Sequence, residues 1–172
     1  MRIFSTFTGI GGFEIGIQNA IKSNRAAQQA SSNSGHSAND TSDPLQERGQ
    51  SATFVGYSEI DKYAIKVYEK HYPGVKNYGD ITKINAEELP DFDCLVGGFP
   101  CQAFSIAGKR RGFDDTRGTL FFDLARILRE KQPRYFVFEN VKGLLSHNQG
   151  NTFRTIITTI DELGYDCQWS VL

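Results

Sequence analysis

Short apolar runs alternate with amphipathic stretches along most of the 172-residue chain, and this alternation constrains the fold more than any other feature. The amphipathic stretches repeat their apolar residues at helical spacing, and the runs between them are short and bounded by glycine or proline, as in buried strands. Alternating strands and helices form a parallel sheet, because a parallel connection needs a crossover that usually holds a helix. The sequence therefore predicts an α/β fold, a parallel sheet with helices on both faces. Strands are expected near residues 2–8, 53–57, 75–78, 92–96 and 135–138, with another beginning at 169–172.

Residues 22–51 interrupt this alternation. They are rich in Ser, Asn, Gln, Ala and Gly and contain almost no large apolar residues. Such a segment cannot bury enough apolar surface to offset the entropy of ordering it. We predict a polar, flexible surface insertion within a single domain that spans residues 1–172; an ordered but irregular loop is the alternative.

Chemically notable residues follow each predicted strand. In parallel sheets, ligands bind beyond the carboxyl ends of the strands. The sequence therefore predicts one site along this edge of the sheet. Its candidates, in chain order, are Gly9–Gly12, Glu59, Asp80, Cys101 and Glu139.

The glycine-rich segment after the first strand favours a bound adenosine. Glycines at 9, 11 and 12 allow a tight turn and close approach of a ligand to the backbone. An acidic residue after the second strand can accept the hydrogen bonds of a ribose diol, and Glu59 has that place. The glycines lack the full dinucleotide spacing, so a smaller adenosine ligand is favoured over a dinucleotide. A turn that serves only packing is the alternative.

Cys101 is a candidate nucleophile. It follows the Gly97–Pro100 turn at the end of the fourth predicted strand, and basic residues follow it. A cysteine reacts as the thiolate, which an accessible and electropositive setting favours. A buried cysteine and a merely solvated basic loop are the alternatives. The basic residues are Lys109, Arg110, Arg111 and Arg117.

Composition excludes several classes of protein. The formal net charge is −1, so any site for a polyanion must be local. Three cysteines, an odd number without close pairing, indicate a reducing compartment. No apolar run approaches the ~20 residues that span a bilayer, and no His or Cys spacing indicates a metal site. We expect a cytoplasmic protein without metal or membrane contacts.

Taken together, these segments resemble DNA (cytosine-5)-methyltransferases. The resemblance covers nearly all of the chain except residues 22–51. It implies a Rossmann-like, S-adenosylmethionine-dependent methyltransferase fold. The motifs that carry it are Phe7-Thr8-Gly9-Ile10-Gly11-Gly12, Glu59-Ile60-Asp61, Asp80-Ile81, Gly98-Phe99-Pro100-Cys101-Gln102, Gly108–Phe113, Asp115–Phe121 and Glu139-Asn140-Val141.

The resemblance implies a covalent mechanism on double-stranded DNA. The Cys101 thiolate would attack C6 of a cytosine while Glu139 hydrogen-bonds N3. C5, then enamine-like, would take the methyl group of S-adenosylmethionine, and loss of the C5 proton with elimination of Cys101 would release 5-methylcytosine. The base must be flipped out of the duplex first, because a stacked base is out of reach.

The resemblance also implies roles for individual residues. Catalytic residues would be Cys101, Glu139, Gln102 and Ser105. Cofactor-binding residues would be Phe7, Thr8, Gly9, Ile10, Gly11, Gly12, Glu59, Ile60, Asp80, Ile81, Gly98, Pro100 and Leu120. DNA would be contacted by Lys109, Arg110, Arg111 and Arg117.

Three parts of the family pattern have no counterpart in this sequence. They are the Gln-x-Arg-x-Arg segment, the target-recognition domain and the C-terminal segment that completes the sheet. We therefore expect a partial catalytic domain of a prokaryotic restriction–modification enzyme. It is either one piece of a naturally divided enzyme, with a complementing polypeptide as a further partner, or a fragment of a longer protein. A non-catalytic remnant that binds cofactor or a partner, and an RNA cytosine-5 methyltransferase, are the alternatives.

Overall fold

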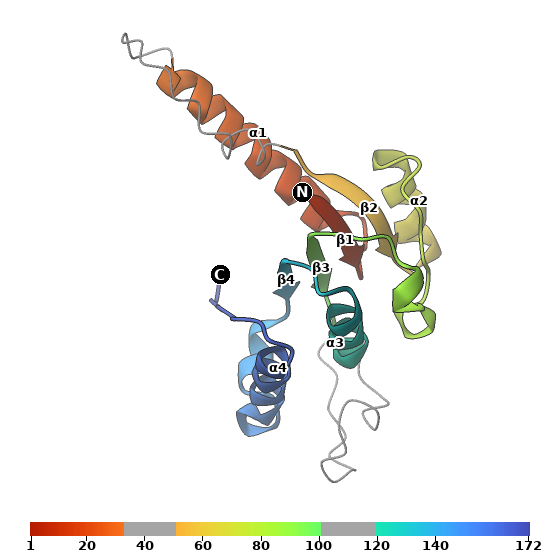
Figure 1. Cartoon of the computed structure of the whole chain (residues 1–172), viewed down its shortest axis with the longest axis vertical. Helices are drawn as coiled ribbons and strands as arrows, with labels where there is room; N and C mark the ends of the chain where they lie inside the picture. The colour runs from red at the N-terminus through yellow and green to blue at the C-terminus, as the bar shows by residue number, and fades with distance from the viewer. Residues whose placement is uncertain (33–50, 101–119) are drawn as a thin grey trace.

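The computed structural model describes residues 1–32, 51–100 and 120–172 (Figure 1). Their main elements are four strands and four α-helices, joined by turns of 3₁₀ helix. The strands are β1 (Arg2–Thr6), β2 (Thr53–Ser58), β3 (Cys94–Gly98) and β4 (Tyr135–Glu139), and the helices are α1 (Gly12–Ser32), α2 (Lys62–His71), α3 (Leu120–Lys131) and α4 (Asn151–Glu162).

The strands form one parallel sheet in the order β2-β1-β3-β4. Thr6 is the register partner of Ser58 on one side and of Gly97 on the other. Gly98 pairs with Glu139 at the end of β4. The carboxyl ends of all four strands therefore meet at one edge, which confirms the predicted parallel sheet.

One face of the sheet is covered by α1. Ile3, Cys94 and Val96 are buried side chains that alternate along β1 and β3, and they pack against Phe13 and Ile17 of α1. Side chains that alternate along a strand share one face, so these contacts fix the face on which α1 lies.

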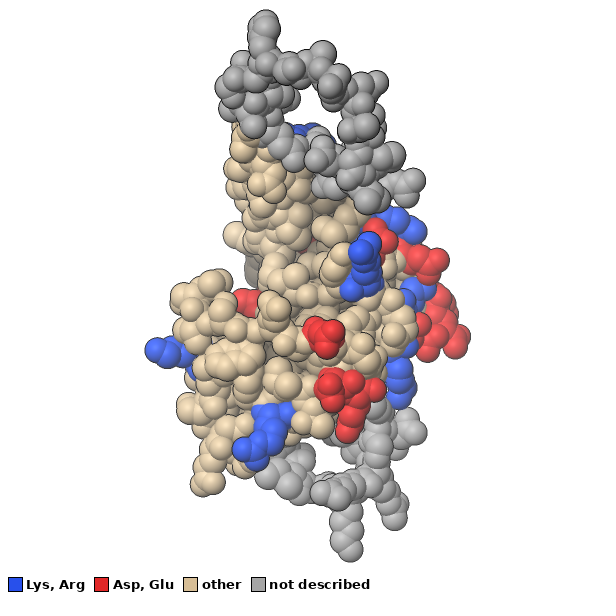
Figure 2. Space-filling view, turned by 60° about the vertical axis from the view of Figure 1, so that its left-hand side comes forward, with Lys and Arg blue, Asp and Glu red and all other residues tan. Residues whose placement is uncertain are grey.

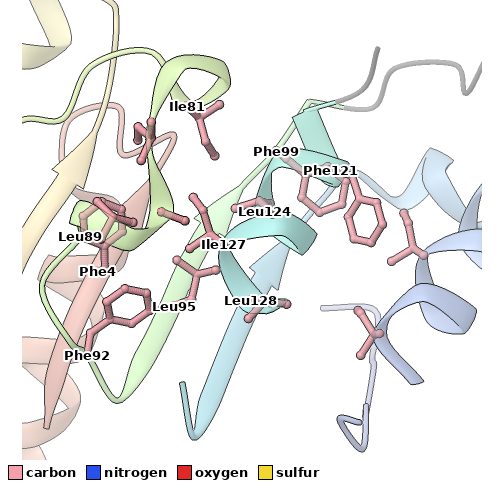
Figure 3. Packing of buried hydrophobic residues seen from close by; sticks show 14 of the residues in the cluster. Phe4, Ile81, Leu89, Phe92, Leu95, Phe99, Phe121, Leu124, Ile127 and Leu128 are labelled. Carbon is pink, nitrogen blue, oxygen red and sulfur yellow. The ribbon is translucent and has the colours of Figure 1, made fainter. Parts of the chain in front are cut away.

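The opposite face holds the larger core. Phe4 and Leu95, which point away from α1, pack with Leu124, Ile127 and Leu128 of α3 (Figure 3). All five side chains have 0% exposure. Each such burial contributes about 1.5–3 kcal/mol of transfer free energy, so α3 anchors this side of the sheet.

The remaining helices follow the same division. Tyr57 is the register partner of Ser5 and stacks on Tyr68 of α2 with ring centroids 4.0 Å apart, which places α2 on the side of α1. On the other side, α4 adds Ile156 and Ile160 to the larger core. The prediction of helices on both faces is confirmed.

Local signals in the sequence set two helix ends. The Asp61 side chain accepts hydrogen bonds from the backbone N–H groups of Tyr63 and Ala64, each at 2.8 Å, and so caps the start of α2. After α4, Gly164 has φ +85°, a left-handed conformation that glycine adopts without steric cost.

Three expectations about secondary structure were wrong. The region 75–78 forms only a single bridge between Asn77 and Tyr57, because the Asn77 side chain takes backbone partners that a strand ladder would use. Residues 169–172 form no strand. Helix α1 continues to Ser32, so the first part of the predicted flexible insertion is helical; residues 33–50 lie outside the described part of the chain.

The described residues contain no helix long and apolar enough to cross a membrane. On the face drawn in Figure 2, acidic and basic side chains stand next to each other along one side, and much of the rest carries no charge. This face therefore presents no field of a single sign, in line with the formal net charge of −1.

Replacing glycine by alanine should have opposite effects on the free energy of unfolding at two positions, Gly97 and Gly16. A Cβ at Gly97 would overlap the Thr6 Oγ1 atom, whereas a Cβ at Gly16, inside α1, would meet no atom within 4 Å. We expect Gly97→Ala to lower the free energy of unfolding by at least about 2 kcal/mol, because it forces β1 and β3 apart. Gly16→Ala should raise it by about 0.5–1 kcal/mol. Urea unfolding measures both, and equal effects would contradict the packing described for Gly97.

Candidate functional site

The glycine-rich turn connects β1 to α1 at the carboxyl edge of the sheet. The Gly11 N–H donates to the Thr8 carbonyl at 2.9 Å, which closes the turn. Phe7, Gly9 and Gly11 have φ values of +52°, +52° and +92°. Glycine adopts a positive φ without steric cost, and it occupies two of these three positions. Phe7 has a positive φ as well, and its half-buried side chain packs against the larger core.

Glu59 joins the turn to the end of β2. Its Oε2 accepts the N–H of Gly9 at 2.8 Å, and its Oε1 accepts the N–H groups of Ile60 at 2.8 Å and Asp61 at 2.9 Å. A carboxylate has about four lone-pair positions. One position remains, so Glu59 can accept one ribose hydroxyl without releasing a backbone partner.

Asn77 holds the backbone of Glu59 in place. Its Oδ1 accepts the N–H of Glu59 at 3.2 Å and of Gly79 at 2.9 Å, and its Nδ2 donates to the Glu59 carbonyl at 3.1 Å. Ser58 Oγ donates to the Gly79 carbonyl at 2.7 Å. These bonds fix the strand end that carries Glu59 against the segment that leads to Asp80.

Asp80 is a second acceptor next to this point. Its Oδ1 accepts from the Thr82 hydroxyl at 2.8 Å and the Thr82 N–H at 3.0 Å, and Lys83 lies 3.6 Å from its Oδ2. The hydrogen bonds from Thr82, with the charge of Lys83, lower the pKa of Asp80. The carboxyl therefore stays ionised at neutral pH and acts only as an acceptor, which suits an amino group such as that of adenine.

Two predicted cofactor-binding residues differ sharply in exposure. Ile60 is 72% exposed and free to contact a ligand. Ile81 is 3% exposed and belongs to the larger core, so its side chain is not open to contact. The side chain of Thr8 is buried, and its Oγ1 has no hydrogen-bond partner among the described residues.

The other half of the site lies where β3 and β4 end. A Cβ at Gly98 would lie 2.9 Å from the Glu139 Oε2 atom, so the absent side chain leaves room for this carboxylate. The Asn140 Nδ2 donates to the Phe99 carbonyl at 2.7 Å. Two segments far apart in the sequence are therefore bonded together one residue before the exposed Pro100.

Several predicted site residues lie outside the described part of the chain. Leu120, the first residue of α3, is described and is half-buried against the larger core. The residues that are not described are Cys101, Gln102, Ser105, Lys109, Arg110, Arg111 and Arg117.

The sequence analysis assigned no role to Asn77 or to the side chain of Asn140. The signal for Asn77 is an asparagine two residues before Gly79 in a segment too polar for a buried strand, a pattern typical of side chains that bond to nearby backbone. For Asn140, only its place directly after Glu139 could have drawn attention.

The described donors and acceptors fit an adenosine ligand. Glu59 and Asp80 supply acceptors for a ribose hydroxyl and an amino group, and the turn with its orphaned Thr8 Oγ1 lies at the same edge. Within residues 1–32, 51–100 and 120–172, no group of three or more His, Cys, Asp or Glu side chains could hold a metal ion.

A family model described as C-5 cytosine-specific DNA methylase matches residues 1–172. The chain is 61% identical to the Type II methyltransferase M1.ScrFI of Lactococcus lactis subsp. cremoris over 109 residues, which cover 63% of this chain and 28% of that protein. It is 41% identical to the Type II methyltransferase M.HhaI of Haemophilus parahaemolyticus over 172 residues, which cover 100% of this chain and 43% of that protein.

Solved structures show the same fold. A methyltransferase encoded within an E. coli prophage matches with a TM-score of 0.61 and 22% identity, over 94% of this chain and 38% of that one. The S. pombe Dnmt2 methyltransferase matches with a TM-score of 0.56 and 20% identity, over 92% of this chain and 41% of that one. The predicted methyltransferase fold is confirmed, and this chain spans less than half the length of these relatives.

Asn77 provides a test of the site geometry. We expect Asn77→Ala to lower the free energy of unfolding by about 1–3 kcal/mol, because the N–H and carbonyl of Glu59 lose their partner at a half-buried position. The control is Asn85→Ala, which removes an exposed cap of a 3₁₀ turn and should cost less than about 1 kcal/mol. Thermal unfolding of both variants decides, and an equal loss would contradict the role given to Asn77.

Proposed function

Because the chain belongs to the C-5 cytosine-specific DNA methylase family, we propose that it is the cofactor-binding and catalytic portion of an enzyme that methylates C5 of cytosine in double-stranded DNA. One observation carries the proposal. The register pair Gly98 and Glu139, with the bond from Asn140 to Phe99, brings the segment that leads to Cys101 beside a carboxylate. A nucleophile and a group that hydrogen-bonds the base are needed at the same place.

Cys101 and Glu139 have different roles in the reaction of the cytosine base. The Cys101 thiolate adds to C6 of cytosine, which makes C5 electron-rich. In its acid form, Glu139 donates a hydrogen bond to N3 and so offsets the negative charge that addition puts on the ring. Once C5 carries the transferred methyl group, loss of its proton and elimination of the Cys101 thiolate restore the aromatic ring and free the enzyme. Gln102 and Ser105 complete the catalytic site in this proposal.

The edge formed by Glu59 and Asp80 would hold S-adenosylmethionine. When bound, this cofactor supplies an electrophilic methyl group on its sulfonium. Glu59 accepts a ribose hydroxyl, Asp80 accepts from the adenine amino group, and Ile60 packs as an exposed aliphatic surface. The Gly9–Gly12 turn, Gly98, Pro100 and Leu120 would line the remainder.

The DNA substrate is proposed from the relatives and from the basic residues after Cys101. Lys109, Arg110, Arg111 and Arg117 would contact phosphates around a flipped cytosine. The Type II methyltransferases among the relatives support a place in a prokaryotic restriction–modification system. Because those relatives are much longer, we propose that a further polypeptide segment reads the target sequence, either in the same protein or as a partner.

Methyl transfer tests the proposal. We would replace the segment of M.HhaI that this chain matches by the chain itself, and measure transfer of labelled methyl from S-adenosylmethionine to duplex DNA. We expect transfer, and a loss of at least about a thousandfold in Cys101→Ser of the same hybrid protein.

Transfer that survives in Cys101→Ser would refute the covalent mechanism. Cofactor binding without any transfer would favour a non-catalytic remnant. Transfer to structured RNA in place of duplex DNA would favour an RNA methyltransferase.

Thiol reactivity provides an independent prediction. Burial, with the charge of Asp93, raises the pKa of the Cys94 thiol to about 11, and burial also raises the pKa of Cys167. At pH 8 only about one Cys94 in a thousand is a thiolate, and alkylation follows the thiolate. We expect iodoacetamide at pH 8 to modify Cys101 at least about tenfold faster than the other two, as measured by peptide mass spectrometry. Faster labelling of Cys94 or Cys167 would contradict Cys101 as the activated nucleophile.

A further inference from the structure

A carboxylate is buried beneath the glycine-rich turn. Glu14, in the first turn of α1, has 0% exposure. Its Oε1 accepts the Tyr68 hydroxyl at 3.1 Å, and its Oε2 has no hydrogen-bond partner among the described residues. Burying a carboxylate is costly unless it is paired, so an apolar side chain would serve packing alone better. The partial positive charge at the start of α1 offsets part of this cost.

Gly11 rests directly on this buried group. A Cβ at Gly11 would lie 3.0 Å from the Tyr72 ring, 3.5 Å from the Tyr68 ring and 3.7 Å from the Glu14 Oε2 atom. The peptide of Gly11 also closes the turn through Thr8 and begins the hydrogen bonding of α1. The distance between the glycine-rich turn and α2 therefore depends on the positions of the Glu14, Tyr68 and Tyr72 side chains.

The same cluster reaches the strand that carries Glu59. Tyr68 stacks on Tyr57, and the backbone of Tyr57 bonds to Lys76 and Tyr78 on either side of Asn77. Burial and the adjacent Glu14 raise the pKa of Tyr68, so its hydroxyl remains a donor at neutral pH. The buried hydrogen bond from Tyr68 to Glu14 thus connects α2 to the start of α1. The bond from Gly9 to Glu59 connects the glycine-rich turn to the end of β2 beside it.

We propose that Glu14 is a positioning residue for the cofactor site. Its hydrogen bond with Tyr68 holds Gly11 against α2 and so keeps the Gly9 N–H within reach of Glu59. The turn is then formed before any ligand binds. The consequence for affinity rests on the proposed function, because it takes the Glu59 edge to be the cofactor site; the effect on the turn itself does not.

The experiment compares four single variants of the full chain and one double variant, Glu14→Leu with Tyr68→Phe. Glu14→Leu and Tyr68→Phe each remove the buried hydrogen bond, and Glu14→Gln keeps an acceptor for Tyr68. Tyr165→Phe is the control, because it removes the hydroxyl that donates to the Pro133 carbonyl at 2.8 Å, far along the chain from the turn. Amide hydrogen exchange at Gly9, relative to Leu95 in β3, measures opening of the turn alone, and titration with S-adenosylhomocysteine measures affinity.

We expect Glu14→Leu and Tyr68→Phe each to speed Gly9 exchange relative to Leu95 by about tenfold. The double variant should be no faster than either single one, because both remove the same bond. Glu14→Gln should stay within about twofold of the wild type, and Tyr165→Phe should leave the ratio unchanged. Affinity for S-adenosylhomocysteine should fall about tenfold in Glu14→Leu and in Tyr68→Phe.

Two results would overturn the positioning role of Glu14. One is a ratio of Gly9 to Leu95 amide exchange that does not change in Glu14→Leu, and the other is a ratio that changes equally in Tyr165→Phe. Failure of the wild type to bind S-adenosylhomocysteine would count against the proposed function instead. The exchange ratio would still decide the role of Glu14, since it needs no ligand.

Discussion

The parallel pairing of β1 with β2 on one side and with β3 on the other is the constraint on which the site depends. Thr6 stands at the centre of this arrangement, with no exposed surface, and its Oγ1 donates to the Val96 carbonyl at 3.1 Å. The approach is so close that β3 needs glycine at position 97. Because all strands end at the same edge, the glycine-rich turn, Glu59 and Gly98 become neighbours although the chain separates them widely.

The half of the site around Glu59 is held by side chains that bond to backbone. Glu59 accepts three backbone N–H groups, and Asn77 satisfies both the N–H and the carbonyl of the same residue. Such bonds place a carboxylate without a regular strand beside it. Their number limits what Glu59 can still accept, so the site is organised in advance for a ligand that needs few further hydrogen bonds from it.

The half around Glu139 is built differently. Among the described strands, β4 pairs only with β3, and its Tyr135 and Val137 are about half exposed. Glu139 itself is exposed, and its carboxylate lies over Gly98. An accessible carboxylate beside a turn that is fixed through Asn140 and Phe99 suits a reaction on a base that must enter from solvent. Hydrogen bonds from side chains to backbone are thus concentrated where a cofactor would rest, and an exposed carboxylate lies where a substrate would arrive.

The alternation of the four observed strands with helices, the parallel sheet and the placement of Glu59 and Glu139 at one edge follow from the sequence alone, because periodicity and glycine breaks are local properties. Only the tertiary structure decided that the region 75–78 replaces a strand by bonds to the Asn77 side chain, that α1 runs on to Ser32, and that Glu14 is buried beneath Gly11. The bonds of Asn77 and the burial of Glu14 depend on partners distant in the sequence. A hydrogen bond such as that from Tyr68 to Glu14 has no periodic signature, since it exists only once the helices have packed on the sheet.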